Sequence, residues 1–187
     1  MDLDWAGDIC IQERTITVII GPSGILEEGL NSCSGVMRRY SFLYVCSNYS
    51  GVLPNLHRTS YEFSVRRGFT SDQMGTIINE CDATYLIIEH DPSLYENDTT
   101  LIPSIINRLK TFARNEGTVV VYSRNLDRFM RALIRASGRA YIYADWANLI
   151  RNSQLKKEQR KNGPVRRIVS RQLKLDQVGT SEAKSAD

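Results

Sequence analysis

The sequence predicts an α/β protein: a three-layer αβα sandwich with helices on both faces of a mostly parallel sheet of five or more strands. Short runs of β-branched and other apolar residues alternate about five times with segments whose apolar side chains recur at helical spacing. The runs are apolar at almost every position, which fits a sheet that is covered on both faces. A chain of 187 residues is long enough for one domain with a substantial core.

The expected elements follow from these patterns in chain order. After a polar lead-in over residues 1–14, five buried strands are expected at 15–20, 41–46, 84–88, 118–122 and 139–144, with a further short strand around 61–65. Helices are expected at about 27–39, 71–81, 101–113 and 126–134. Thr70 and Gln73 form a capping-box pattern at the start of the second helix. Gly117 and Gly138 are expected to end the third and fourth helices.

The basic charge is concentrated in one C-terminal segment. Residues 1–150 hold 14 Lys/Arg and 17 Asp/Glu, whereas residues 151–174 hold nine Lys/Arg and one Glu. We therefore divide the chain into a core at 1–150, a basic linker at 151–175 and a disordered tail at 176–187. The end of the linker is compatible with the return strand of a C-terminal β-hairpin.

Composition argues against several classes of protein. No apolar run approaches the ~18 residues of a membrane span, and the acidic N-terminus lacks the layout of a secretory signal. A cytoplasmic location without a membrane partner is therefore expected. The four cysteines are widely spaced in or beside apolar segments and are expected to be buried thiols. His57 and His90 are isolated, so no metal site is predicted from them.

The stretch TITVIIGPSGILEE, residues 15–28, has the layout of a strand, a glycine-rich turn and a helix. A phosphate-binding P-loop, G-x-x-x-x-G-K-[ST], has the same layout. The first half of that pattern is present as Gly21, Pro22, Ser23 and Gly24. In the second half, glycine, lysine and Ser/Thr are replaced by Leu26, Glu27 and Glu28. A carboxylate thus stands in place of the cation that would reach the phosphates.

With these motifs the chain resembles the RecA/RadA/KaiC-like branch of P-loop NTPases over about residues 8–145. TITVIIGPSG resembles the Walker A strand and turn, YLIIEHDPS the Walker B strand, TVVVYSRN the strand that ends in a polar sensor residue, and GRAYIYAD the closing strand. The resemblance implies the strand order 5-1-4-3-2. It also implies an acidic residue after the Walker B strand, and Glu89 or Asp91 could fill that position. It further implies a glutamate after the second strand, but Ser47 and Asn48 stand there instead.

Two of the three catalytic elements are therefore missing, and such groups contribute several kcal/mol each to transition-state stabilisation. No catalytic residue is assigned, and hydrolysis at a useful rate is not expected. Two interpretations of the turn stay open. Residues 21–24 either retain binding of ATP and Mg²⁺ with Glu89 and Asp91, or they form a structural turn whose helix dipole is neutralised by Glu27 and Glu28 in the first helical turn. The two carboxylates after the Walker B strand likewise either hold a metal or are hydrogen-bonded structure.

Two basic features are candidate contacts for nucleic acid or for a protein partner. The first is a row of arginines at helical spacing, opposite the apolar face of the last helix: Arg124, Arg128, Arg131, Arg135 and Arg139. The second is the basic segment, with Lys156, Lys157, Arg160, Lys161, Arg166, Arg167, Arg171 and Lys174. A solvated surface is the alternative for both.

The resemblance and the missing groups together predict a non-catalytic RecA-like accessory or regulatory subunit, a pseudo-ATPase with a degenerate Walker A motif. The family implies DNA recombination or repair as its setting. Its partners would be single-stranded DNA, an active RecA-family ATPase or a second copy of the chain. Two alternatives stay open: a weak ATP-binding or ATP-hydrolysing protein with a rearranged loop, and a protein-assembly subunit that binds no nucleic acid.

Overall fold

A six-stranded sheet forms the centre of the computed structural model, which describes residues 2–7, 9–56, 63–96, 98–115 and 117–143. Its strands are β3 (Ile16–Ile20), β4 (Phe42–Cys46), β5 (Phe63–Arg67), β6 (Tyr85–Glu89), β7 (Thr118–Ser123) and β8 (Arg139–Ile142). They lie in the order β5-β4-β6-β7-β3-β8, and every neighbouring pair is parallel.

The five main strands were each expected from the sequence, and their order β8-β3-β7-β6-β4 is the order 5-1-4-3-2 that the resemblance implied. The further short strand, expected around 61–65, is present as β5 at Phe63–Arg67. It pairs with β4 only and forms one edge of the sheet. The prediction of a mostly parallel sheet is therefore confirmed.

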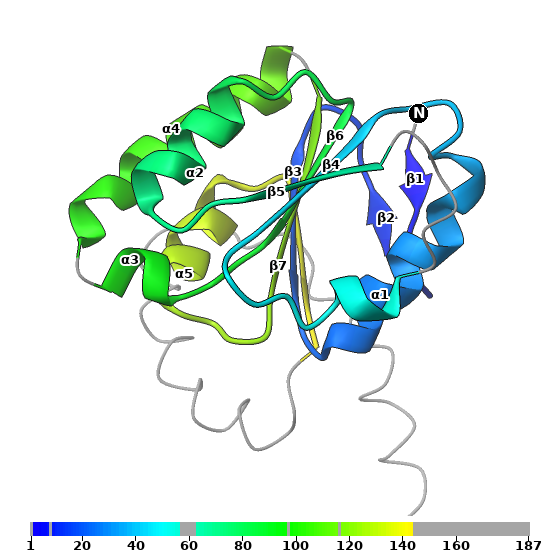
Figure 1. The fold of residues 1–187 in the computed structure, drawn as a ribbon, viewed down its shortest axis with the longest axis horizontal. Coiled ribbons are helices and arrows are strands. Elements are labelled where there is room, and N and C mark those ends of the chain that lie inside the picture. The colour runs from blue at the N-terminus through cyan, green and yellow to red at the C-terminus, as the bar shows by residue number, and fades with distance from the viewer. Residues whose placement is uncertain (1, 8, 57–62, 97, 116, 144–187) are drawn as a thin grey trace, which may run out of the picture.

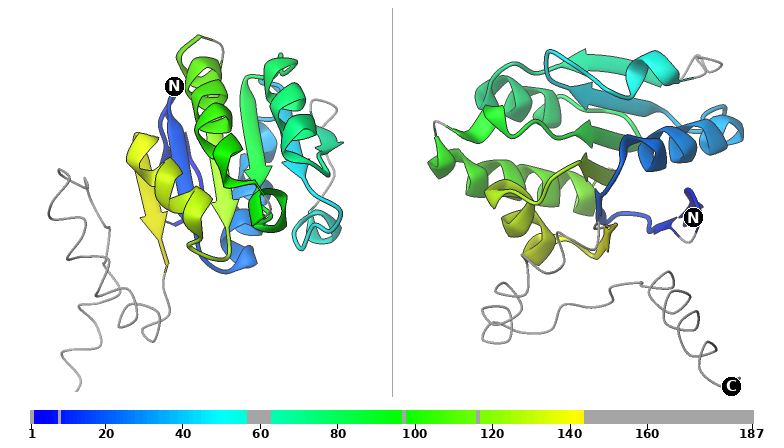
Figure 2. Two further views of the ribbon diagram at one scale, coloured as in Figure 1. Left: turned by 90° about the vertical axis from the view of Figure 1, so that its left-hand side faces the viewer. Right: turned by 90° about the horizontal axis from the view of Figure 1, so that it is seen from below.

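Two layers of helices enclose the sheet (Figures 1 and 2). One face is covered by α2 (Ser71–Asn79), α3 (Ser93–Glu96), η3 (Thr99–Leu101), α4 (Ile102–Asn115) and α5 (Arg128–Ala136). The other face is covered by α1 (Ser23–Ser32), η1 (Cys33–Gly35) and η2 (Leu53–Asn55). The three-layer αβα architecture follows, because each strand is apolar on both of its sides.

Alternation along the strands divides the core in two. In β3, Ile16, Val18 and Ile20 pack with the helices of the first layer, whereas Ile19 packs on the α1 side. The first of these two clusters is mainly aliphatic, and the second contains most of the buried aromatic side chains of the strands. Of the cysteines, Cys33, Cys46 and Cys81 are buried, as expected.

The N-terminal segment is not the polar lead-in that we expected. It forms a small antiparallel hairpin of β1 (Leu3–Asp4) and β2 (Cys10–Ile11), and its side chains join the core on the α1 side. Trp5 is buried against Gly29 of α1, and the Ser32 hydroxyl donates to the carbonyl of Trp5 at 2.6 Å. The two strands are too short to show periodicity, so only their tertiary contacts reveal them.

Two helix starts agree with local sequence signals. At α2, the Gln73 amide donates to the Thr70 hydroxyl at 3.2 Å, and the Gln73 side chain accepts from the Phe69 amide at 2.9 Å. The Thr70 N-cap is thus confirmed, whereas the Gln73 side chain binds the amide of Phe69 and not that of Thr70, which a standard capping box requires. At α5, the carboxylate of Asp127 accepts from the Met130 amide at 2.8 Å, which fixes the first helical residue as Arg128.

The predictions for residues 151–187 lie outside the described part of the chain. These are the basic linker at 151–175, its β-hairpin and the disordered tail at 176–187. No helix in the described part is long and apolar enough to cross a bilayer.

Candidate functional site at the carboxyl edge of the sheet

Parallel strands bring the predicted site residues together at one edge of the sheet. The segments at residues 21–24, 47–48, 89–91 and 123–124 lie at or just beyond the ends of β3, β4, β6 and β7. β3 and β7 are neighbours, yet α1 leaves β3 toward one face and α5 leaves β7 toward the other. Such a reversal opens a crevice where ligands of α/β sheets usually bind.

The connection from β3 to α1 consists of only two residues, Gly21 and Pro22. The helix begins at Ser23, four residues before the expected start, with Pro22 at its N-cap. The Gly21 amide donates to the Ser123 carbonyl at 3.1 Å, and the Tyr122 hydroxyl donates to the Gly21 carbonyl at 2.9 Å. Both backbone polar groups of Gly21 are therefore hydrogen-bonded to β7.

The expected neutralisation of the helix dipole by Glu27 and Glu28 is wrong. Because α1 starts at Ser23, both carboxylates lie beyond its first turn, which contains no acidic residue. They stand on the second turn, where a charge interacts more weakly with the helix terminus. The apolar spacing that predicts this helix begins at Leu26, so it does not reveal that the helix extends back to Ser23.

The turn does not fit the phosphates of a nucleotide. A P-loop wraps phosphate with the residues between its first glycine and its lysine, but here most of those residues are already helical. A Cβ built on Gly21 would lie 2.9 Å from Ile25 Cδ1 and 2.9 Å from the Tyr143 Cβ. The space over this glycine is thus filled by the protein's own side chains. The cationic and hydroxyl groups of the pattern are replaced as well, so these residues do not fit ATP and Mg²⁺.

Glu89, the predicted Walker B carboxylate, organises the connection between β4 and η2. Its carboxylate accepts hydrogen bonds from the Tyr44 hydroxyl at 2.6 Å, from the Ser50 hydroxyl, and from the Gly51 amide at 3.0 Å. Burial, reinforced by the nearby charge of Glu89, raises the pKa of Tyr44 well above its usual range. The Arg124 guanidinium lies directly over Gly51, since a Cβ there would come closer than 3.0 Å to it.

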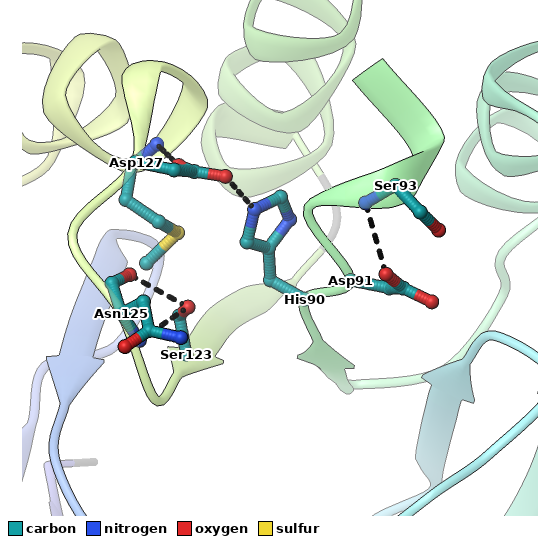
Figure 3. Close-up of polar contacts among 7 residues, drawn as sticks. His90, Asp91, Ser93, Ser123, Asn125 and Asp127 are labelled. Carbon is teal, nitrogen blue, oxygen red and sulfur yellow. Dashed lines mark hydrogen bonds and ion pairs between the residues drawn. The ribbon is translucent and has the colours of Figure 1, made fainter. Parts of the chain in front are cut away.

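Asp91 has a separate set of partners. Its carboxylate accepts from the Ser47 hydroxyl and from the Ser93 amide, the latter at 2.9 Å (Figure 3). Burial favours the neutral form, but these hydrogen bonds outweigh it and hold the pKa of Asp91 below its usual range. Glu89 and Asp91 are thus hydrogen-bonded structure at two distinct points. Nowhere in the described ranges do three His, Cys, Asp or Glu side chains gather as a metal site requires.

His90 links the end of β6 to the start of α5. Its Nε2 lies 2.6 Å from an Asp127 carboxylate oxygen, and Figure 3 shows the imidazole pointing toward that carboxylate. The ring stacks on Phe129, with centroids 4.7 Å apart. Burial opposes the charge of Asp127, but hydrogen bonds from His90 and from the Met130 amide outweigh it and hold the pKa of Asp127 below its usual range.

Sequence reasoning missed the residues that hold this edge together. Tyr44 and Tyr122 were counted only among the strands, and the bond between His90 and Asp127 joins residues 37 positions apart. One signal is present in the sequence: each tyrosine lies in an otherwise apolar strand, and a buried tyrosine hydroxyl usually finds a partner. Nothing local indicated which partner.

The predicted arginine row is only partly one surface. Arg128, Arg131 and Arg135 are exposed on one side of α5, whose apolar side faces the sheet. We call these three residues the α5 arginine face. Arg124 precedes the helix and lies over Gly51, and Arg139 belongs to β8, where its Nη1 donates to the Cys10 carbonyl at 3.2 Å. The helical spacing breaks because Asp127 caps α5 and the helix ends at Ala136.

The second predicted basic feature lies outside the described residues. This is the segment with Lys156, Lys157, Arg160, Lys161, Arg166, Arg167, Arg171 and Lys174. Its role in binding stays a prediction.

Comparison with known proteins gives one relative and no family. No family model matches the chain. An uncharacterized protein of Archaeoglobus fulgidus is 33% identical over 121 residues, which cover 64% of this chain and 61% of that protein. The chain thus spans about three fifths of the relative's length.

Proposed function

We propose that this protein is a non-hydrolysing RecA-like accessory subunit that acts in DNA recombination or repair and binds single-stranded DNA. The observation that carries the proposal is the two-residue connection between β3 and α1, closed over by Ile25 and Tyr143. This connection belongs to a sheet whose strand order is the one that the resemblance implies. The proposal thus combines the scaffold of a RecA-like ATPase with a turn that cannot enclose phosphate.

The loss of hydrolysis follows from what phosphoryl transfer needs. Catalysis there is almost entirely positioning and electrostatic stabilisation of the transferred group. Glu27 and Glu28 stand where the pattern has its lysine and its Ser/Thr hydroxyl, Glu89 already accepts three hydrogen bonds, and Ser47 donates to Asp91. The side chains at the expected catalytic positions thus form hydrogen bonds that stabilise the loops of this edge. This supports an accessory role over the alternative of a weak ATPase.

The α5 arginine face supports nucleic acid as the partner. Its three guanidinium groups lie on one exposed side of a helix that is held from behind by buried Phe129, Met130 and Leu133. The only side-chain hydrogen bond to this face is the one from Arg128 to the Thr99 hydroxyl, at 3.2 Å, among the described residues. Arginine suits phosphate because its planar fork binds two oxygens at once.

Fluorescence anisotropy of a labelled single-stranded oligonucleotide tests the nucleic-acid part of the proposal. Binding should weaken steeply between about 50 mM and about 200 mM salt, because each neutralised phosphate releases counterions. The absence of salt-sensitive binding would refute this part and favour a protein-assembly subunit. A full-length variant with glutamine at the basic positions of residues 156–171 separates the contribution of that segment.

A nucleotide-binding measurement tests the other part. Wild-type protein should show no saturable binding of a fluorescent ATP analogue with Mg²⁺ and no phosphate release. Turnover that disappears in Glu89→Gln would contradict the proposal and establish the weak-ATPase alternative. Glu89→Gln keeps the shape of the side chain, so any lost turnover would report on the carboxylate.

A further inference from the structure

Two exposed aromatic residues follow the ends of the neighbouring strands β4 and β5, at one corner of the sheet. Tyr49, three residues after β4, is 92% exposed, and Phe69, two residues after β5, is 52% exposed. We propose that Tyr49, Phe69 and Arg67 form a stacking platform for the bases of single-stranded nucleic acid. This inference rests on the proposed function and names the part of the surface that the bases contact.

Backbone hydrogen bonds hold the segments of this corner in place. β4 and β5 are paired in register to their last residues, Cys46 and Arg67, and the pairing continues as the Gly68 amide donates to the Cys46 carbonyl at 3.0 Å. The segments that carry the two rings therefore leave neighbouring strands at the same level. Phe69 is held further by its amide, which donates to the Gln73 side chain at 2.9 Å.

Arg67 is fixed beside the backbone that leads into Tyr49. Its Nη1 donates to the carbonyl of Asn48 at 2.9 Å, and that carbonyl belongs to the peptide that joins Asn48 to Tyr49. Its neighbour Arg66 instead reaches Glu80, the residue after α2, at 3.1 Å, so the charge of Arg66 is already balanced. The guanidinium of Arg67 thus adds a positive charge at the corner that carries the two aromatic residues.

The chemistry of these three residues selects the partner. Large apolar rings in water attract another flat apolar surface, and a guanidinium beside them attracts an anion or stacks on a π face. Single-stranded nucleic acid offers both groups at every nucleotide, and sequence-independent binders combine exposed aromatics with positive charge in this way. Duplex DNA would not fit, because its bases are stacked on each other.

One single-stranded oligonucleotide of modest length can reach both the platform and the α5 arginine face. β4 and β3 are separated by three strand spacings in the sheet, which amounts to about 14 Å. The corner lies at the end of β4, and α5 packs against β3. One oligonucleotide of about 15 nucleotides, within the usual range of site sizes, is therefore a suitable probe.

The test compares two labelled probes that carry the same charge: an oligo(dT) of about 15 nucleotides and an abasic oligonucleotide of the same length. Wild-type protein should bind oligo(dT) more tightly, by about fivefold to 150-fold for each base that stacks. Tyr49→Ala with Phe69→Ala should lose that preference and keep the affinity for the abasic probe. Tyr49→Trp with Phe69→Trp, which keeps two aromatic rings, should retain the preference.

The outcomes separate this inference from the proposed function. Equal, salt-sensitive binding of both probes by the wild type would overturn the platform and leave the DNA-binding proposal intact. Binding of neither probe would overturn both. Because both rings are exposed, the alanine variant should melt at the wild-type temperature, and loss of binding with unchanged melting is attributable to the rings.

Discussion

Replacing Gly29 by alanine tests how the N-terminal hairpin is joined to α1. A Cβ at this position would lie under 3.0 Å from three atoms of the Trp5 indole, which is itself only 3% exposed. Ordinary carbon contacts are about 3.5–4 Å, so the rigid ring has to move by more than about 1 Å within a packed core. Overpacking costs about 1–3 kcal/mol, and expelling a buried tryptophan costs about 3–5 kcal/mol. We therefore expect Gly29→Ala to lower the free energy of unfolding by about 2–4 kcal/mol.

Gly24→Ala, in the same helix, is the matched control. A Cβ there meets nothing within 4 Å, so alanine should stabilise the protein by up to about 1 kcal/mol through its higher helix propensity. Urea unfolding followed by far-ultraviolet circular dichroism gives both values from the midpoint and slope. A neutral or stabilising Gly29→Ala would refute the packing of Trp5 on α1. A destabilising Gly24→Ala would also count against our description of the turn as a simple helix start.

Four further substitutions test the carboxyl edge and a helix cap. Tyr44→Phe should lower the free energy of unfolding by about 1.5–3 kcal/mol, because the lost hydroxyl donates to the carboxylate of Glu89. Tyr122→Phe loses a bond to a neutral carbonyl and should lower it by only about 0.5–1.5 kcal/mol. Equal losses would contradict these two hydrogen-bond partners. Hydrogen bonds hold the pKa of Asp127 low, so its contribution to stability is complete above about pH 4 and is lost as the pH falls through its depressed native pKa. Asp127→Asn should therefore flatten the acid side of the profile of unfolding free energy against pH, and an unchanged profile would argue against the ion pair. Thr70→Ala should cost about 1 kcal/mol in urea unfolding through loss of the α2 cap, and no loss would show that the bond from the Gln73 amide is dispensable.

The fold could be predicted because its signals are local and repeated. Runs such as ITVII and TVVVY are apolar at every position, which only a strand buried on both faces requires. The N-cap at Thr70 fixed the start of α2, since the cap and its partner lie three residues apart. Strand order is a long-range property, and it was reached only through the resemblance to a known family.

The sequence predicted where the candidate site lies but not which side chains are hydrogen-bonded to each other there. Parallel strands had to bring Glu89 and Asp91 to the edge where β3 ends, so their location followed from the strand pattern. Their partners did not, because Tyr44 and Ser47 are 45 and 44 residues away in the chain. The same limit applies to the first turn of α1: the apolar spacing that predicts this helix begins later, but Ser23 is already helical.

Errors at the N-terminus and in the arginine row have related causes. The hairpin that holds Trp5 has strands of two residues, which are too short for any periodic signal. Arg124 and Arg139 matched the helical spacing by number alone, because spacing does not reveal where a helix is capped. A tertiary contact, the packing of the Trp5 indole on Gly29, decides the structure of the N-terminus, whereas a local N-cap, the Asp127 carboxylate, sets the first turn of α5.

The salt dependence of affinity for single-stranded DNA tests the central claim most directly. Arg128→Gln, Arg131→Gln and Arg135→Gln together should lower the slope of log affinity against log salt by about 2, since each phosphate contact contributes about 0.7 for a single strand. The matched control replaces three exposed arginines elsewhere in the core, Arg38, Arg39 and Arg114, and changes the net charge by the same amount. Our account predicts a lower slope for the first variant and a wild-type slope for the control. Equal slopes for the two variants would contradict a DNA-binding role for the α5 arginine face.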